Sequence, residues 1–346
     1  MPLSNRLRIA VALPHLGVYG GIRRFFELGR VWTGLGHQVA LLTPAPGPGG
    51  EPAEAWLPFG GEIGAITRLA TERWDAVLSP DPRLFLEIET PGALRVFYAV
   101  LEKAPRAEEA CRRADLVLAN SAGMMRHLAR HGIAAADGVG GVNLDFFRPP
   151  SPDPRPDRAA RGAPVKALVY GRLSRRRKGT WAAARAVDLA ARDAGVAVEL
   201  TLFDAPPPGT SEAAEPLPLR VPHRWVLRPS QEELADLYRD ADLFVSAERR
   251  AGWCNTAAEA MACGAAVVCT PSGTEDFARD GATALVARWP WAWLLAKPIA
   301  RLLRHPGERL RIAARGHEAI RAFGWERTAN GILSLIQDRV AGAAAR

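Results

Sequence analysis

The segment that decides the fold is Ala251–Thr270, AGWCNTAAEAMACGAAVVCT. It predicts a tight loop with an unusual turn at Gly252, then a short helix, and then a strand buried on both faces. The side chain of Asn255 or Thr256 is expected to cap the helix. Backbone N–H groups from Cys254 to Ala257 would then point out of the helix start. Together with the helix dipole they favour an anion there, most simply a phosphate.

A second interpretation of the same residues needs no ligand. Thr256 and Glu259 have the spacing of a capping box, in which the glutamate only bonds to the backbone at the start of its own helix. Under either interpretation Gly264 is a natural residue to end the helix. The local pattern therefore leaves a phosphate site and a plain helix cap both open, and only the surrounding sequence can decide between them.

Strand-like and helix-like runs alternate on both sides of this segment. LRIAVAL, QVALLT, DAVLS and DLVLAN precede a stretch rich in proline and charge, after which KALVYG, VAVELTLF and DLFVSA resume the pattern. Such alternation predicts an α/β fold of parallel sheets with crossover helices. With 346 residues, the chain suits two doubly wound, Rossmann-like domains. We expect them at residues 1–150 and 165–325, with a linker at 151–164 and a final helix at 326–346.

Composition narrows the class of protein without naming a partner. Hydrophobic residues make up 48% of the chain, which is ample for packed cores, and the net charge of +8 favours anionic partners. The four cysteines lack a zinc-like spacing and indicate a reduced, cytoplasmic protein. The early run LRIAVAL contains Arg8 and predicts a first strand, not a signal peptide. Arg175–Arg177 predict a solvated loop, because no nucleic-acid motif accompanies them.

The signature GWCNTAAEAMACGAAVV resembles that of the retaining GT-B glycosyltransferases of family four, also called group 1. Members usually read E-G-F-G-x-P-x-x-E-A-M-A-x-G-x-P-V-V, and the resemblance covers nearly the whole chain. It implies a GT-B fold, in which two Rossmann-like domains face a central cleft. Glu259 falls on the family glutamate that holds the nucleotide ribose. Ala251 falls on the other glutamate, beside the donor sugar, and Glu248 is the acid that could reach the same space.

The same resemblance implies where the donor diphosphate binds. Arg172 and Lys178 match the family pattern G-R-x-x-x-x-K-G with one extra residue between them, and in the family these two cations hold the diphosphate. An arginine fork and a lysine charge can stabilise a leaving diphosphate without a metal. The backbone around Arg228 is implied to meet the nucleobase, and Gly273 and Thr274 the pyrophosphate or sugar. The remaining implied donor contacts come from the signature itself: Gly252, Trp253, Cys254, Asn255 and Thr256.

The first domain offers weaker candidates. In the family, a glycine pair at the position of Gly20 and Gly21 faces the cleft. Many members carry a histidine near the strand RVFYAV, where this chain has Tyr98. The other candidates on the cleft side of this domain are His15, Asp81 and Glu102.

Two further segments bear on cofactors and partners. Asp240-Ala241-Asp242 matches the D-x-D metal motif of a different fold, but its place between a helix and a strand predicts turn chemistry. We therefore expect no metal and no cofactor beyond the nucleotide-sugar substrate. The segment WPWAWLLAKPIARLLR is basic and amphipathic. It indicates either peripheral membrane attachment through Trp and Arg, or helices like those with which family members end, one of which crosses back to the first domain.

These patterns together predict a retaining, metal-independent glycosyltransferase that moves a hexosyl or deoxyhexosyl group from a nucleoside-diphosphate sugar. The acceptor is unidentified, with anionic and lipid-linked acceptors as options, in polysaccharide or glycoconjugate biosynthesis. Catalytic roles are implied for Arg172, Lys178 and Glu248. Because Ala251 replaces the usual glutamate, the alternative is a non-catalytic protein that binds nucleotide sugars through a degraded sugar pocket.

Overall fold

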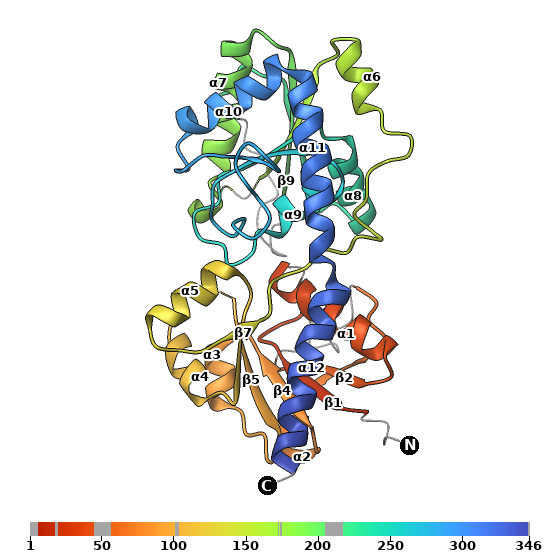
Figure 1. Cartoon of the computed structure of the whole chain (residues 1–346), viewed down its shortest axis with the longest axis vertical. Helices are drawn as coiled ribbons and strands as arrows, with labels where there is room; N and C mark the ends of the chain where they lie inside the picture. Colours follow the sequence, from red (N-terminus) through yellow and green to blue (C-terminus); the bar gives the residue numbers. More distant parts are fainter. Residues whose placement is uncertain are drawn as a thin grey trace. The chain divides into compact units, whose positions relative to one another are not determined.

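The computed structural model describes residues 6–17, 20–44, 57–100, 104–171, 173, 175–204 and 217–344. The chain forms two compact units, the first made of Met1–Gly141 with Phe323–Arg346 and the second of Val142–Ala322. Each unit is a parallel β-sheet flanked by helices (Figure 1). The predicted α/β fold with two Rossmann-like domains is therefore confirmed.

The first unit contains a seven-stranded sheet with the strand order β3-β2-β1-β4-β5-β6-β7. The order reverses between β1 and β4, the mark of a doubly wound sheet. Its elements are β1 (Arg8–Ala12), α1 (Gly20–Gly34), β2 (Gln38–Thr43), β3 (Glu62–Ala65), α2 (Arg68–Thr71), β4 (Ala76–Ser79), α3 (Pro82–Glu87), β5 (Leu94–Ala99), α4 (Ala107–Arg113), β6 (Leu116–Ala119), α5 (Ala122–Arg130), β7 (Ala136–Asp137) and α12 (Trp325–Ala344).

The second unit contains a six-stranded sheet with the order β10-β9-β8-β11-β12-β13, and its order reverses between β8 and β11. Its elements are α6 (Arg155–Ala160), β8 (Val165–Tyr170), the 3-10 turn η1 (Arg176–Lys178), α7 (Thr180–Ala194), β9 (Val198–Asp204), β10 (His223–Leu227), α8 (Gln231–Asp240), β11 (Leu243–Ser246), α9 (Asn255–Ala262), β12 (Ala266–Cys269), β13 (Leu285–Val286), α10 (Ala292–Arg304), α11 (Pro306–Ile320) and η2 (Arg321–Phe323), which leads into the first unit.

Continuous apolar runs explain why these strands are central. The side chains of β4, β6, β11 and β12 are buried along their whole length, as expected for parallel strands covered on both faces. In the second unit, the alanine-rich face of α7 and the leucines of α10 complete one core. The small alanine side chains let α7 and α10 pack closely, and the two helices lie together on one side of the unit (Figure 1).

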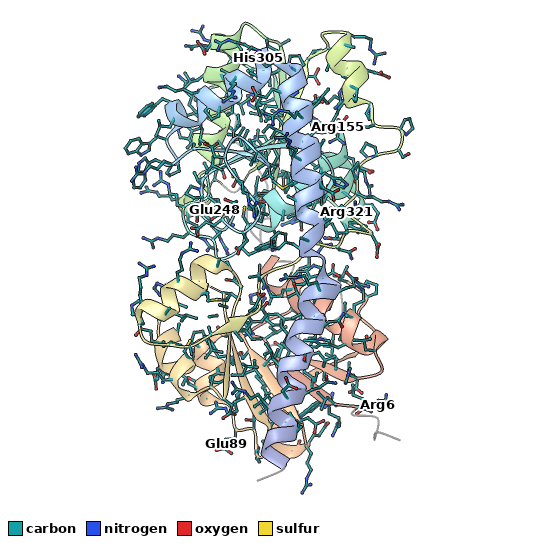
Figure 2. The ribbon with its side chains drawn as sticks, in the orientation of Figure 1. Arg6, Glu89, Arg155, Glu248, His305 and Arg321 are labelled. Atoms are coloured by element: carbon teal, nitrogen blue, oxygen red, sulfur yellow. The ribbon has the colours of Figure 1, made fainter. Side chains whose placement is uncertain are left out.

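The segment predicted as a linker, residues 151–164, lies inside the second unit and carries α6. Arg155 of this helix, which Figure 2 labels, is only 2% exposed. Its guanidinium donates to the carbonyl of Cys263 at 2.9 Å and pairs with Asp153 at 2.8 Å. Proline and charge in this segment therefore mark a packed helix start and a buried arginine rather than an extended connection.

The final helix α12 belongs to the first unit, where it packs against α1. Trp325, Ile332 and Ile336 are buried in that core, and the indole N–H of Trp32 donates to the carbonyl of Ala329 at 2.9 Å. Among the described residues, no helix combines the length and the apolar character that crossing a bilayer would require.

Candidate functional site

The decisive segment, Ala251–Thr270, folds as loop, helix and strand, as predicted. Helix α9 begins at Asn255, and its N-cap is Cys254 without a side-chain capping bond. The predicted caps at Asn255 and Thr256 are therefore wrong, and so is the capping-box interpretation. Thr256 lies two residues past the N-cap Cys254, inside the first turn of α9, so it cannot be the capping residue.

Gly264 ends the helix as predicted. Its φ is +80°, the left-handed conformation that glycine adopts without strain. The N–H of Gly264 donates to the carbonyl of Met261, and the N–H of Ala265 donates to the carbonyl of Ala260. This pair of bonds is the Schellman motif, and it turns the chain directly into the buried strand β12.

Three loops of the second unit meet where the sheet order reverses. They follow β8, β11 and β12 at the carboxyl ends of these parallel strands, which is where doubly wound sheets bind ligands. We call this region the strand-end site and define it by Tyr170–Gly179, Ala247–Cys254 and Thr270–Thr274, apart from positions 172 and 174, which the structure does not describe.

Hydrogen bonds fix these loops to one another. The N–H of Arg249 donates to the carbonyl of Arg177 at 2.7 Å, which ties the β11 loop to the β8 loop. The N–H of Cys254 donates to the carbonyl of Gly273 at 2.8 Å, which ties the β11 loop to the β12 loop. The hydroxyl of Thr270 donates to the carbonyl of Glu248 at 2.5 Å. These bonds within the protein therefore hold the loops of the strand-end site in place without a ligand.

Gly179 allows the closest approach between these loops. Its φ is +64°, and a Cβ at this position would collide with the carbonyl oxygen of Ala247. The glycine both ends η1 and caps α7. Because Gly179 has no side chain, the neighbouring Lys178 can approach the end of β11.

Lys178 and Glu248 form the charged centre of the strand-end site. The ammonium of Lys178 donates to Oε2 of Glu248 at 2.6 Å, and it lies 5.5 Å from the ring of Tyr170. Glu248, which Figure 2 labels, is only 4% exposed. Within the described residues, its second oxygen, Oε1, has no hydrogen-bond partner.

Burial raises the pKa of the Glu248 carboxyl, although the nearby charges of Lys178 and Arg177 oppose the shift. A buried carboxylate with one unused oxygen is costly unless a hydrogen-bond donor reaches that oxygen. The free oxygen is suited to accept a hydroxyl, and the paired lysine is suited to bind an anion. The arrangement therefore combines an acceptor and a cation at one end of one sheet.

Glu259 lies on α9 and is 7% exposed. The phenolic hydroxyl of the fully buried Tyr238 donates to its Oε2 at 2.9 Å. Burial also raises the pKa of Tyr238 well above its ordinary value, so the phenol stays a donor. The sequence did not point to Tyr238, since a tyrosine on an amphipathic helix is usually only a core residue.

Several other predicted donor contacts are used inside the protein. Thr274 is 1% exposed, and its hydroxyl donates to the carbonyl of Thr270 at 2.7 Å, so the structure contradicts its prediction as a ligand contact. The N–H of Cys254 is likewise taken by Gly273. Trp253 is buried against Phe277 at a ring-centroid distance of 4.9 Å. These residues shape the loop rather than line an open surface.

The remaining predicted residues of this unit lie at or near the strand ends. Gly252 lies buried in the bend before α9. Gly273 has a φ of +73°, and a Cβ there would come within 2.7 Å of the Cβ of Ala251. Arg228 directly follows β10, is exposed and has a φ of +51°. Arg172 lies outside the described residues.

In the first unit, the predicted candidates do not form one cluster. Tyr98 is 0% exposed, and its hydroxyl donates to the carbonyl of Gly138 and accepts from Arg24, so its prediction as a cleft residue is wrong. Asp81 accepts from the N–H of Leu84 at 2.9 Å and caps α3.

His15 is exposed and accepts from the N–H of Gly17 at 3.1 Å. Burial of part of its ring lowers the pKa of His15, and Asp81 opposes the shift. Gly20 begins α1, and a Cβ at Gly21 would meet nothing within 4 Å. Glu102 lies outside the described residues. The contacts of His15, Asp81 and Tyr98 are accounted for by local structure and packing.

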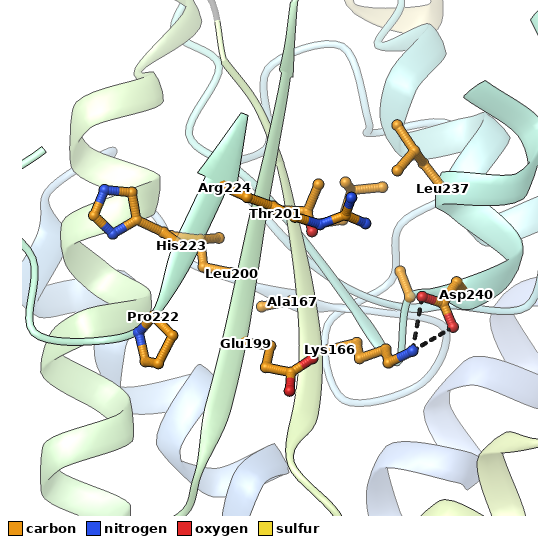
Figure 3. Close-up of a pocket in the computed structure, with 12 residues that line it drawn as sticks. Lys166, Ala167, Glu199, Leu200, Thr201, Pro222, His223, Arg224, Leu237 and Asp240 are labelled. Atoms are coloured by element: carbon orange, nitrogen blue, oxygen red, sulfur yellow. Dashed lines mark hydrogen bonds and ion pairs between the residues drawn. The ribbon is translucent and has the colours of Figure 1, made fainter. Parts of the chain in front are cut away.

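The D-x-D sequence has a structural role, as predicted. Asp242 accepts from the N–H of Lys166 at 2.9 Å, and Asp240 pairs with the ammonium of Lys166 at 2.8 Å. Both lie at the amino end of β8, away from the strand-end site. A hollow of about 280 Å³ opens beside them over β8, β9 and β10 (Figure 3). In the part of the chain that the structure describes, no group of three His, Cys, Asp or Glu side chains could hold a metal.

Comparisons with known proteins relate the chain to glycosyltransferases. Residues 164–305 match the family described as glycosyl transferases group 1. The chain is 30% identical over 217 residues to a D-inositol 3-phosphate glycosyltransferase of Frankia alni, covering 59% of this chain and 53% of that protein. It is 32% identical over 208 residues to the protein of the same description in Mycobacterium tuberculosis, covering 56% and 42%. The chain thus spans about half the length of the curated relatives it matches.

Solved structures share the fold over almost the whole chain. A sucrose-phosphate synthase from Thermosynechococcus elongatus has a TM-score of 0.75 at 20% identity and covers 97% of this chain and 100% of its own. Anabaena HepE in complex with UDP and glucose has a TM-score of 0.71 at 14% identity and covers 96% and 100%. Residues 164–305 of the second unit thus match the group 1 glycosyl transferases in sequence, and the whole chain shares the GT-B fold of these solved structures.

Proposed function

We propose that this protein is a retaining, metal-independent glycosyltransferase that uses a nucleoside-diphosphate sugar bound at the strand-end site. Hexosyl and deoxyhexosyl donors both fit this proposal. The pairing of Lys178 with the half-used carboxylate of Glu248 at the sheet reversal is the observation that carries it. Further support comes from the glycosyltransferase description of the relatives and from HepE, which was solved with UDP and glucose.

Each group has a distinct role in this proposal. Lys178 would bind the diphosphate and stabilise the charge that grows on it as the sugar leaves. Oε1 of Glu248 would accept a hydrogen bond from a hydroxyl of the donor sugar. The N–H groups of Asn255 and Thr256 at the start of α9 remain available to a phosphate within the helix geometry. Arg172 stays a predicted second cation, and Glu259 a predicted ribose contact.

One observation favours the alternative of a non-catalytic protein that binds nucleotide sugars. Ala251 occupies the position of the family glutamate beside the donor sugar, and its Cβ packs closely at Gly273. Glu248 is then the acid at this end of β11 that could contact the sugar. If it serves only as the partner of Lys178, the protein would bind a donor without transferring from it.

Calorimetry with UDP, GDP, ADP and dTDP tests the binding half of the proposal. Lys178→Ala should weaken binding of whichever diphosphate the wild type prefers by about 1.5–3 kcal/mol, the scale of a charge-assisted hydrogen bond. Lys166→Ala is the matched control, because Lys166 lies at the opposite end of β8 and pairs with Asp240. Unchanged diphosphate affinity in Lys178→Ala would show that Lys178 does not bind the diphosphate.

Turnover separates the two functions. The wild type should transfer or hydrolyse the sugar of a matching donor in the presence of a chelator, and the anomeric configuration of the product should be that of the donor. A protein that binds nucleotide but neither transfers nor hydrolyses any donor across a broad acceptor panel would establish the non-catalytic alternative instead.

A further inference from the structure

Large apolar side chains are concentrated on one part of the second unit. The exposed ones among the described residues are Leu35, Trp181, Trp289, Trp291 and Trp293. The four tryptophans are each between 46% and 55% exposed and belong to the second unit. An exposed cluster of such large side chains usually marks an interaction surface.

Three of these tryptophans stack in sequence. The ring centroids of Trp289 and Trp291 are 6.2 Å apart with an interplanar angle of 22°, and those of Trp291 and Trp293 are 5.8 Å apart at 28°. Arg288 lies over Trp289 at 5.7 Å, and Lys297 lies over Trp293 at 5.9 Å. We call these five residues the tryptophan ladder. It consists of three indoles with a cation at each end.

Trp181 lies at the same end of the unit as the ladder. It belongs to the first turn of α7, and Trp293 belongs to the first turn of α10. The two helices pack together, and an ion pair of 2.8 Å joins Arg304 to Asp193 near their carboxyl ends. The helices therefore run in the same direction, and their first turns lie together at the carboxyl ends of the strands.

The charge around these tryptophans is positive. Residues 284–304 contain four cations and no acid, and residues 175–187 contain five cations and no acid. Some of these cations have carboxylate partners elsewhere. Arg176, Arg288 and Lys297 form no ion pair with any residue that the structure describes. The exposed indoles are thus surrounded by positive charge that is available to an anionic partner.

The ladder geometry favours a membrane surface over a sugar or a nucleobase. A sugar or base stacks on an open aromatic face, but the faces of the ladder rings are turned toward one another and toward the terminal cations. Their edges remain exposed. Tryptophan edges and polar tips suit the headgroup region of a bilayer, where nearby Lys and Arg attract anionic lipids.

We propose that the tryptophan ladder, with Trp181, docks the second unit onto an anionic membrane surface. The apolar face of α10, with Leu295, Ile299 and Leu302, is buried in the core. The contact would therefore be made by the indoles and not by a helix lying in the bilayer. This surface does not depend on the proposed transferase activity. It would nonetheless bring the strand-end site near a membrane-bound acceptor.

Vesicle flotation tests the docking. The wild type should float with phosphatidylcholine vesicles that contain about 30% phosphatidylglycerol, and much less with phosphatidylcholine alone. Trp289→Ser/Trp293→Ser should lower the partition coefficient at least about tenfold. Leu35→Ser is the matched control, because Leu35 is equally exposed but lies in the first unit, and it should leave binding unchanged.

The cations should contribute separately. Arg288→Gln/Lys297→Gln should lower binding to the anionic vesicles by about fivefold or more, while hardly changing the weak binding to neutral ones. Added salt should reduce wild-type binding and should affect this variant less. Unchanged melting temperatures would show that both double variants remain folded, as expected for exposed positions.

Several results would overturn the proposal. The first is a wild type that floats with neither vesicle, and the second is a tryptophan variant that floats as well as the wild type. If the wild type binds no vesicles but self-associates, and the tryptophan variant loses this self-association, the ladder contacts a second copy of the chain instead.

Quenching by brominated lipid tests the docking without any variant. Bound wild type must lose part of its tryptophan emission, and full emission would show that the indoles stay outside the bilayer.

Discussion

Glu248→Gln is expected to tighten the binding of a free nucleoside diphosphate while abolishing sugar transfer. In the wild type, the carboxylate of Glu248 lies 2.6 Å from the ammonium of Lys178. A phosphate bound to the same ammonium would feel the attraction of the lysine and the repulsion of the glutamate. The amide removes the repulsion and keeps the shape of the side chain. It cannot replace the charge that strengthens a bond to a sugar hydroxyl.

The magnitude follows from the geometry of Lys178. A phosphate oxygen at about 2.8 Å on the open side of the ammonium would lie about 5 Å from the carboxylate oxygen. Two unit charges at that distance repel by about 3 kcal/mol when the effective dielectric constant is about 20. The Lys178 side chain is 23% exposed, so solvent weakens this repulsion. An expected gain of about 1–2 kcal/mol corresponds to roughly five- to thirtyfold tighter binding.

The assay is calorimetry with the diphosphate that the wild type binds best. Glu318→Gln is the control for a general change of charge, because Glu318 is exposed on α11 and pairs with Arg321, away from the strand-end site. It should leave affinity unchanged. Equal or weaker binding in Glu248→Gln would refute the reasoning, because either Lys178 would not be the phosphate cation or Glu248 would not lie against it in solution.

The same substitution should alter the pH dependence of stability. The folded-state pKa of Glu248 is raised above the ordinary 4.5, chiefly by burial. The folded state therefore holds this proton more tightly, and the wild type should lose stability as the pH rises through that window. Glu248→Gln cannot titrate. The difference in unfolding free energy between wild type and variant should thus favour the variant increasingly as the pH rises, as measured by denaturant titration.

Two further substitutions test the scaffold of the site. Gly179→Ala should destabilise the protein by about 3 kcal/mol or more in denaturant unfolding, because its Cβ would strike the carbonyl of Ala247. Gly195→Ala has the same left-handed backbone in open space and should cost only about 1 kcal/mol; equal losses would exclude the clash. Tyr238→Phe should cost about 1–2 kcal/mol and weaken nucleotide binding, because it removes the hydrogen bond that holds Oε2 of Glu259 in place. Unchanged nucleotide affinity in this variant would show that Glu259 does not contact the nucleotide.

Sequence reasoning predicted the fold because the relevant signals are periodic and local. Alternating strand-like and helix-like runs predict the two parallel sheets, and Gly264 marks the end of α9 by a left-handed backbone that other residues rarely adopt. Ser230 and Glu233 have the local spacing of a capping box, and they form one at α8 with both reciprocal bonds present. In each case neighbouring residues along the chain determine the outcome, so one sequence was sufficient.

Sequence reasoning failed where the decisive partner is distant in the chain. Thr256 and Glu259 have the spacing of a capping box, but Tyr238 engages Glu259 from another helix and the cap is absent. Tyr98 was placed on the cleft because family members carry a histidine near this strand, yet its contacts with Arg24 and Gly138 leave it fully buried. Short-range patterns cannot distinguish such side chains, because their environment is set by contacts across more than twenty residues.

The sequence indicated where the candidate site lies and named two of its charged residues. Lys178 and Glu248 were both named from the sequence, but the pairing between them was not. They are separated by 70 residues, and only the close approach at Gly179 brings them together. This contact changes the expected role of the lysine, because its charge is already shared before any phosphate arrives.

One carboxylate oxygen of the strand-end site, Oε1 of Glu248, is left without a hydrogen bond among the described residues. Backbone bonds consume the N–H groups of Arg249 and Cys254 and the hydroxyl of Thr270, so these parts of the loops are satisfied without a ligand. Oε1 of Glu248 is buried and, within the described chain, lacks a partner. A fold that satisfies its neighbours so fully gains nothing in stability by leaving this oxygen unpaired. A ligand hydroxyl that completes the pairing gives the most direct physical reason for a buried carboxylate at this position.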